Sequence, residues 1–310
     1  MLSLAGVHTH IGQYHILQGV DLTVPRGELT VLLGRNGAGK TTTLRTIMGL
    51  WHASRGALLF DGRDITQAAT PDISCAGIAY VPENMGIFSD LTVRENLLLA
   101  ARAGEPDTAR LEWIFGFFPA LKKFWNQAAG TLSGGQKQML AIARAIVEPR
   151  KLLLVDEPTK GLAPAIIQSL ITAFRELKAM ETTILLVEQN FSFVKSLGDT
   201  VAVMDDGRIV HSGRMDELAE DRELQQKPFI DTQRTLRLHR THFSFDPTTL
   251  QFLPPRGMPF PAGISTTTSE YRAIASAAIS GVMASSAFSL AALTFSGHQS
   301  GSIGRQPVHM

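Results

Sequence analysis

The hydrophobic pattern of the first 227 residues predicts buried strands that end in polar residues. Residues 29–33 (Leu-Thr-Val-Leu-Leu) form a short apolar run before a glycine-rich stretch, and residues 152–155 (Leu-Leu-Leu-Val) form another that ends in two acids. Strands covered on both faces show such continuous runs instead of alternation. Ligands of open α/β sheets bind at the carboxyl ends of strands. The pattern therefore predicts an α/β fold with its chemistry after these two strands.

The middle of the chain has a helical pattern. Thr92 and Glu95 match a capping box that opens a helix through Ala101. A second helical stretch covers about residues 107–123, with an interruption at Pro119. One further helix has apolar residues at i, i+3, i+4 and i+7, namely Met139, Ile142, Ala143 and Ile146. Five aromatic residues are predicted to belong mainly to the core: Phe115, Phe117, Phe118, Phe124 and Trp125.

The composition changes after about residue 227. Beyond Pro228 the chain has no lysine and only three acids, while Ser, Thr, Pro, Gly and Ala dominate. We therefore place a domain boundary at about 226–228, and we expect residues 228–310 to be a low-complexity, disordered tail. A recent fusion or a shifted reading frame would explain so abrupt a change.

One segment of this tail, residues 273–295, carries no charge and is just long enough to span a bilayer. It is rich in Ser, Ala and Gly, and it has no basic cluster that would mark a cytoplasmic flank. A disordered appendage remains the expectation for the whole tail.

Charge and cysteine content exclude some classes of protein. The 310 residues include 29 basic and 28 acidic side chains, a formal net charge of +1, so no basic excess indicates binding to nucleic acid. The 44% of hydrophobic residues is enough for a sizeable core. Cys75 is the only cysteine, which excludes an internal disulfide and fits a reducing cytosol. Residues 1–10 lack the pattern of a secretory signal, so none is expected.

The residues after the first apolar run match the phosphate-binding loop G-x-x-x-x-G-K-T. They lie between a predicted strand and a helical pattern over 42–50, which is the context that the motif requires. Glycines let backbone N–H groups point at phosphate oxygens, Lys40 would reach the β- and γ-phosphates, and the Thr41 hydroxyl would bind Mg²⁺. The motif predicts a nucleoside triphosphatase. Its expected ATP-binding residues are Gly34, Arg35, Asn36, Gly37, Ala38, Gly39, Lys40, Thr41 and Thr42.

The second apolar run ends in Asp156 and Glu157. At the carboxyl edge of a parallel sheet, Asp156 would meet Mg²⁺ directly or through water. Glu157 would orient and polarise the water that attacks the γ-phosphate. An isolated Asp-Glu pair is most often a solvated strand end, but here the pair shares a chain with a phosphate-binding loop.

Residues 132–136 read Leu-Ser-Gly-Gly-Gln, and Gln136 stands 20 residues before Asp156. Ser133 would cap a helix whose glycines leave backbone N–H groups open to an anion. The order of loop, signature and acidic strand resembles that of the ABC ATPase family over about residues 2–226. The resemblance implies a RecA-like P-loop NTPase core with an antiparallel β edge and an α-helical subdomain at about 84–148. It also implies a signature that binds ATP held by a partner subunit, through Ser133, Gly134, Gly135 and Gln136.

Three local variants resemble one branch of that family, the second ATPase subunit of branched-chain amino acid importers. Glu83 stands where most ABC ATPases have glutamine, Gln189 where most have histidine, and residues 161–164 (Gly-Leu-Ala-Pro) replace the usual Ser-Ala-Leu-Asp. By resemblance, Glu83 would join Thr41 and Asp156 around Mg²⁺, and Gln189 would contact the γ-phosphate as a catalytic residue. Because Glu83 adds negative charge and Gln189 cannot be a cation, we expect this site to hydrolyse ATP more slowly than its partner's.

The contact to adenine is less well marked. The family usually has an aromatic ring before a glycine at this point, whereas this chain has Ile11 before Gly12 and Tyr14 further on. Tyr14 would stack on the base; the alternatives are an apolar contact from Ile11 alone and a surface role for Tyr14.

The resemblance implies partners as well. It implies a second ABC ATPase subunit, in a heterodimer, and two membrane-spanning permease subunits, a short helix of which would enter a groove near residues 83–96. A substrate-binding protein would take part indirectly, and the chain would lie peripherally on the cytoplasmic face of the inner membrane. The urea importer's ATPase and an exporter-type, lipid-extracting system remain alternatives. A DNA-repair or chromosome ATPase would need a coiled-coil insertion, and a ribosome-acting protein two cassettes; neither pattern is present.

Overall fold

The computed structural model describes residues 1–101, 104–220, 244–246 and 251–253. The chain divides into two units, Met1–Leu236 and Arg237–Met310, which are described separately. In the second unit, β11 (Ser244–Asp246) pairs antiparallel with β12 (Gln251–Leu253). The rest of the predicted tail, with the candidate span 273–295, and the predicted boundary at 226–228 lie outside the described residues. Within the described ranges, no helix is both long and apolar enough to cross a bilayer.

A six-stranded sheet forms the centre of the first unit, in the order β10-β9-β3-β8-β7-β6. The five strands from β9 to β6 run parallel, and β10 pairs antiparallel with β9 at the edge. Every residue of β3, β7 and β8 is buried, which confirms the prediction made from the apolar runs of β3 and β7. The strands are β3 (Leu29–Gly34), β6 (Ile78–Val81), β7 (Leu152–Asp156), β8 (Thr183–Val187), β9 (Thr200–Asp205) and β10 (Arg208–Arg214).

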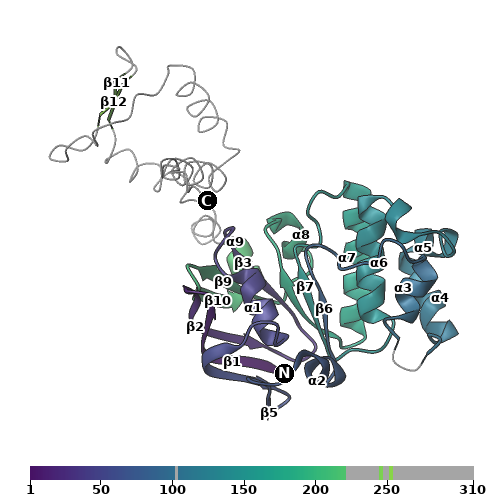
Figure 1. The fold of residues 1–310 in the computed structure, drawn as a ribbon, viewed down its shortest axis with the longest axis horizontal. Helices are drawn as coiled ribbons and strands as arrows, with labels where there is room; N and C mark the ends of the chain where they lie inside the picture. Colours follow the sequence, from purple (N-terminus) through teal and green to yellow (C-terminus); the bar gives the residue numbers. More distant parts are fainter. Residues whose placement is uncertain (102–103, 221–243, 247–250, 254–310) are drawn as a thin grey trace, which may run out of the picture. The chain divides into compact units, whose positions relative to one another are not determined.

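Both faces of this sheet are covered, because successive side chains of a strand point to opposite sides. Leu29, Val31 and Leu33 of β3 pack into one core together with α6 (Gly134–Ile146) and α7 (Pro164–Ala179). Leu32 packs into the other core, which also contains Leu44 of α1 (Lys40–Ile47). Figure 1 shows α6 and α7 on one side of β6 and β7 and α1 beside the strands of the N-terminal sheet.

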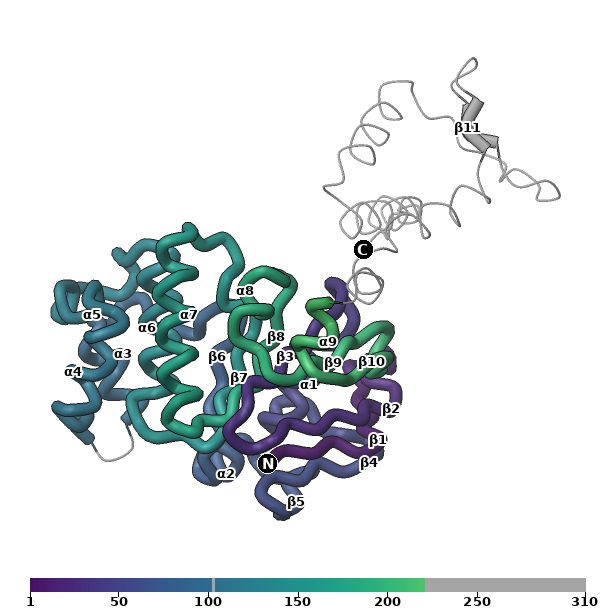
Figure 2. Tube along the Cα trace, turned by 180° about the vertical axis from the view of Figure 1, so that it is seen from behind, coloured from purple at the N-terminus to yellow at the C-terminus, as the bar shows by residue number. Residues whose placement is uncertain are grey.

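The predicted antiparallel β edge is confirmed as a second sheet in the order β2-β1-β4-β5. All three of its strand pairs are antiparallel. Figure 2 shows this sheet from behind, where β1, β2 and β4 run next to one another. The elements of this part are β1 (Leu2–Ile11), β2 (Tyr14–Val24), β4 (Ala53–Phe60), β5 (Arg63–Asp64) and α2 (Thr70–Cys75).

The predicted helical segment contains α3 (Val93–Leu98), α4 (Thr108–Phe117), α5 (Pro119–Lys123) and the 3₁₀ turn Ala129–Thr131, followed by α6. The capping box of Thr92 and Glu95 is formed. The helix ends at Leu98, earlier than predicted: Ala100 N–H bonds to Leu97 in the tighter i→i−3 manner, and Ala101 N–H is shared between the carbonyls of Leu97 and Leu98. Phe118, fully buried, separates α4 from α5, where Pro119 starts the new helix. The other four aromatic residues pack against the core, as expected.

The described part of the first unit also contains two short helices, α8 (Phe191–Lys195) and α9 (Met215–Glu220).

Candidate functional site

The loop between β3 and α1 can be built only with glycine at key positions. An added Cβ at Gly34 would lie 2.4 Å from the carbonyl oxygen of Met204. Gly37 and Gly39 have φ of +83° and +107°, a region that other residues rarely adopt. Gly39 is the N-cap of α1 and has no side chain to cap the free N–H groups of the first turn. The helix start is therefore open to an anion, and nothing lies within 4 Å of a Cβ at Gly37.

Lys40 extends back along this loop. Its Nζ donates hydrogen bonds to the carbonyl oxygens of Gly34 and Arg35, both at 2.9 Å, and lies 3.6 Å from Oε1 of Glu157. Burial lowers the pKa of the Lys40 ammonium, and the charges of Glu157 and Asp156 partly oppose that shift. A buried ammonium among carbonyls and carboxylates is suited to bind a phosphate.

Asp156, the last residue of β7, is fully buried and faces the loop. Its Oδ1 accepts a hydrogen bond from Thr41 Oγ1 at 3.2 Å, and its Oδ2 accepts one from the Tyr80 hydroxyl at 3.3 Å. Burial raises the pKa of Asp156, and the bond from Thr41 partly opposes this. Burial and, after it, the negative charge of Asp156 raise the pKa of Tyr80 to about 12. The Tyr80 hydroxyl therefore keeps its proton and remains a hydrogen-bond donor.

Glu157 has a left-handed backbone, with φ of +46°, which a non-glycine residue adopts only where its surroundings enforce it. Its N–H is held by the carbonyl of Val187 at 2.9 Å. Gln189 Nε2, from the loop after β8, donates to Glu157 Oε1 and to Asn36 Oδ1, both at 2.6 Å. Gln189 therefore links the acidic strand to the phosphate-binding loop.

Glu83, in the loop after β6, does not contact Thr41 or Asp156 by a hydrogen bond. It pairs with Lys160, whose Nζ lies 2.5 Å from Glu83 Oε1. The pKa of Lys160 is raised, mainly by its hydrogen bond to Glu83 and by the negative charge of that carboxylate. Both side chains border a cavity of about 360 Å³ between the loop and the acidic strand. The lining residues are Ile16, Asn36, Gly37, Gly39, Lys40, Thr41, Thr42, Glu83, Glu157 and Lys160.

The cavity fits a nucleoside triphosphate with a divalent cation. The open start of α1 and the Lys40 ammonium favour phosphates, and the oxygens of Thr41 and Asp156 are hard donors that Mg²⁺ prefers. Among the described residues, no group of three or more His, Cys, Asp or Glu side chains is arranged to hold a metal. Mg²⁺ often completes its coordination with waters and substrate phosphates.

The signature residues do not line this cavity. Ser133 caps α6: its hydroxyl accepts from Gln136 N–H at 3.3 Å, and its own N–H donates to Gln136 Oε1 at 2.9 Å. The predicted cap is therefore confirmed, and Met139, Ile142, Ala143 and Ile146 form the buried face of the helix as predicted.

The predicted adenine contact, Tyr14, is exposed and does not line the cavity either. Ile16, two residues further along β2, borders it instead. Sequence reasoning missed Ile16 and Lys160. A signal pointed only to Lys160, which is three residues after Glu157. Alternation could not indicate Ile16, because the pairing of β2 is irregular between His15 and Leu17.

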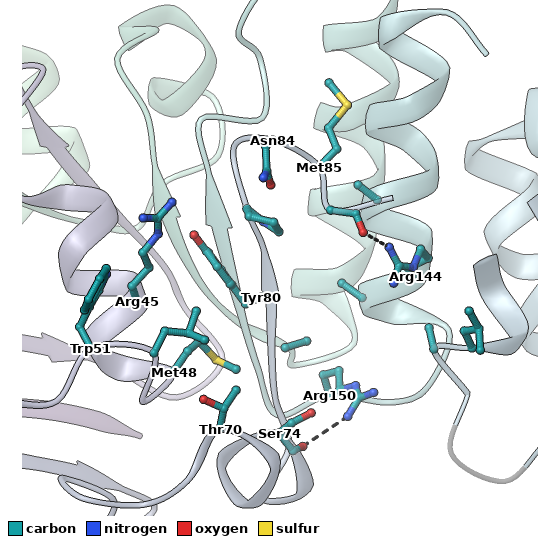
Figure 3. A pocket seen from close by; sticks show the side chains of 18 residues that line it. Arg45, Met48, Trp51, Thr70, Ser74, Tyr80, Asn84, Met85, Arg144 and Arg150 are labelled. Carbon is teal, nitrogen blue, oxygen red and sulfur yellow. Dashed lines mark hydrogen bonds between the residues drawn. The ribbon is translucent and has the colours of Figure 1, made fainter. Parts of the chain in front are cut away.

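A second, larger groove of about 760 Å³ lies between the sheet and the helical segment (Figure 3). Arg45 and Trp51 lie on one side of it, and Arg144 and Arg150 on the other. Trp51 Nε1 and the Nε atoms of both Arg144 and Arg150 are buried without a hydrogen-bond partner. Of the described residues that line the groove, none is acidic, and Leu50 and Leu99 are exposed. The surface therefore suits a segment with apolar residues and a carboxylate.

Comparison with known proteins decides the family. The family model described as ABC transporter matches residues 17–160. The high-affinity branched-chain amino acid transport ATP-binding protein BraG of Pseudomonas aeruginosa is 41% identical over 212 residues, which cover 68% of this chain and 91% of BraG. The chain belongs to the ABC transporter family.

Another relative and a solved structure of this family are also similar to the chain. The methionine import ATP-binding protein MetN of Rhizobium johnstonii is 34% identical over 225 residues, which cover 69% of this chain and 61% of MetN. The crystal structure of a nucleotide-free ATP-binding cassette from an ABC transporter superposes with a TM-score of 0.63 at 28% identity, over 73% of this chain and 97% of that one. This ABC protein is thus an ATP-binding subunit with the cassette fold, and its activity is ATP hydrolysis.

Proposed function

We propose that the cavity beside Lys40 is the MgATP site of this ABC ATPase and that Glu157 is its catalytic carboxylate. The observation that carries the proposal is the meeting, in one cavity, of the buried Lys40 ammonium, the open start of α1 and Glu157, the residue after β7. Gly34 to Thr42 would hold the phosphates, and Thr41, Asp156 and Glu83 would face Mg²⁺.

The residues of the site divide the work of hydrolysis. Lys40 would stabilise negative charge on the β- and γ-phosphates, and Glu157 would orient the attacking water and accept its proton. Gln189 would hold Glu157 in place through the bond at 2.6 Å and reach the γ-phosphate with its amide. Bound Mg²⁺ supplies charge neutralisation on the phosphates.

The signature would act on a different nucleotide. Ser133, Gly134, Gly135 and Gln136 lie outside the cavity of their own chain, so their open helix start remains available for ATP on a partner. Two cassettes would then close around two nucleotides, and a second, different ABC ATPase is the partner we propose.

The transported substrate is proposed to be a branched-chain or related amino acid. Support comes from the name of BraG, the relative at 41% identity, and from Glu83, Gln189 and residues 161–164. MetN, at 34% identity, is named for the import of methionine, which is also an apolar amino acid. A urea importer or an exporter-type system uses the same kind of ATPase cassette and remains the second candidate.

The 760 Å³ groove is the proposed contact with two membrane-spanning permease subunits, which would place the chain peripherally on the cytoplasmic face of the inner membrane. A substrate-binding protein would act only through those subunits. The expected groove position needs refinement: Met85 and Gly86 line it, whereas Asn96 is buried and bonds to the backbone of Phe88 and Leu91.

A pull-down tests the assembly. The Glu157→Gln variant would be purified with MgATP from native membranes, and its partners would be identified. Two multi-spanning subunits with a second ABC ATPase that has histidine at the position of Gln189 support the proposal. Recovery of soluble partners alone, or of a self-dimer on an unrelated membrane protein, would discard the amino acid importer and leave the ATPase intact.

The groove itself is tested by Leu99→Asp. A carboxylate on this exposed apolar surface would be desolvated on docking, so we expect recovery of the membrane subunits to fall by about tenfold or more. The matched control is Val210→Asp on β10, because Val210 is 60% exposed and Leu99 is 61% exposed. Equal recovery for the two variants, with ATP binding unchanged in both, would show that the groove is not the permease contact.

The residue at position 189 is proposed to set the speed of this site. Gln189→His replaces a neutral amide with a side chain that can carry positive charge near the γ-phosphate. We expect a turnover about two- to tenfold higher in the assembled transporter, since charge-assisted bonds are the stronger ones. Phosphate release at saturating MgATP measures it, and an unchanged or lower rate would contradict the idea of a slow site.

A further inference from the structure

Two charged side chains of the nucleotide cavity form an ion pair for which the proposed chemistry gives no reason. Lys160 Nζ lies 2.5 Å from Glu83 Oε1 and 3.9 Å from Glu157 Oε2. Glu83 follows β6 and Lys160 follows β7, and these strands are parallel neighbours, so their carboxyl ends bring the two residues to one edge of the sheet. Both line the same cavity as Lys40 and Thr41.

The pair matters because of the charge that it balances. Glu83 adds a third carboxylate to a region that already contains Asp156 and Glu157, and each negative charge there repels a triphosphate. Lys40 lies 3.6 Å from Glu157, and Lys160 lies 3.9 Å from the same carboxylate. Lys160 contributes a second cation at the point where the extra carboxylate stands. Water screens the pair, since Lys160 is 66% and Glu83 44% exposed, so its effect is moderate.

We propose that Lys160 is a positioning residue for Glu83: it neutralises and holds this carboxylate, and so allows a cavity with glutamate at position 83 to accept ATP. The proposal rests on the assignment of the cavity to MgATP. A neutral residue at position 83 would leave Lys160 only its longer contact, 3.9 Å, with Glu157, so most of the effect of Lys160 on ATP affinity is expected to depend on the charge of Glu83. The two residues are therefore expected to act as one unit.

Calorimetric binding of ATP to the full chain without Mg²⁺ tests this, because a free divalent cation would itself neutralise Glu83. Lys160→Gln keeps a hydrogen-bond donor but removes the charge, and we expect ATP affinity to fall about three- to fivefold. Lys160→Arg should keep the affinity. Lys160→Gln combined with Glu83→Gln should restore it. With Mg²⁺ added, Lys160→Gln should reach half-maximal binding at a lower Mg²⁺ concentration, since Glu83 is then free to attract the cation.

A matched control is Lys122→Gln, because Lys122 is 59% exposed and pairs with Glu112 at 2.7 Å, outside the cavity; its ATP affinity should not change. The proposal is overturned if Lys160→Gln leaves ATP affinity unchanged, or if its loss is as large in the Glu83→Gln background. The cavity assignment fails separately: it fails if removal of the Lys40 ammonium leaves ATP binding intact.

Discussion

Replacement of Glu157 by glutamine is expected to lower ATP hydrolysis about 10²- to 10⁴-fold and to leave ATP binding nearly unchanged. The glutamine amide keeps the size of the side chain and an oxygen that can accept a hydrogen bond from Gln189 Nε2, which lies 2.6 Å from Glu157 Oε1 in the wild type. It cannot accept the proton of the attacking water. The loss should therefore appear in kcat and not in KM, which separates chemistry from binding. Phosphate release by the assembled ATPase at saturating MgATP measures the first, and nucleotide calorimetry measures the second.

The side chain of Glu157 also lies 3.6 Å from the Lys40 ammonium. Loss of the carboxylate charge therefore removes a negative partner of Lys40. ATP affinity should for this reason stay equal or rise slightly, since one negative charge near the phosphates has gone. Glu112→Gln is the control, because Glu112 is an exposed acid that pairs with Lys122 and neither residue lines the cavity. Hydrolysis within a factor of about three of the wild type would remove Glu157 from the role of general base.

The sequence predicted the elements that local patterns determine. The runs at β3 and β7 are continuous and apolar because those strands are buried on both faces, so they were recognisable without any partner. The capping box before α3 and the Ser133 cap before α6 depend on residues close in sequence, and both are formed. Local spacing was therefore sufficient for the core of the fold and for the phosphate-binding loop.

Features that depend on neighbouring strands were not predictable in the same way. Glu83 and Lys160 stand 77 residues apart and meet only because β6 and β7 pair in parallel. The adenine side shows a second reason: β1 and β2 have register shifts, so counting alternate residues cannot tell which of Tyr14 and Ile16 faces the cavity. The arginines of the groove come from α1, α6 and the segment after α6, which only the packed fold brings together.

Replacement of Lys40 by methionine is expected to weaken ATP binding by about 10- to 100-fold, because hydrogen bonds to charged groups contribute about 1.5–3 kcal/mol. Hydrolysis should fall further, by about 10²- to 10³-fold, since the ammonium would stabilise charge that develops in the transition state. Methionine is unbranched and keeps most of the length and the apolar character of the stem of this buried side chain. Calorimetry with ATP and phosphate release under saturating nucleotide distinguish the two losses.

The same variant also separates binding from folding. The Lys40 ammonium is buried, and burial lowers its pKa, so the folded chain already bears a cost for this charge. Its removal takes away that cost together with the bonds to the carbonyls of Gly34 and Arg35. We expect the two effects to offset each other, so that the free energy of unfolding changes by about 1 kcal/mol or less. A strong loss of stability with unchanged ATP affinity in the folded fraction would instead make Lys40 a structural residue, because a phosphate-binding ammonium must change affinity when it is removed.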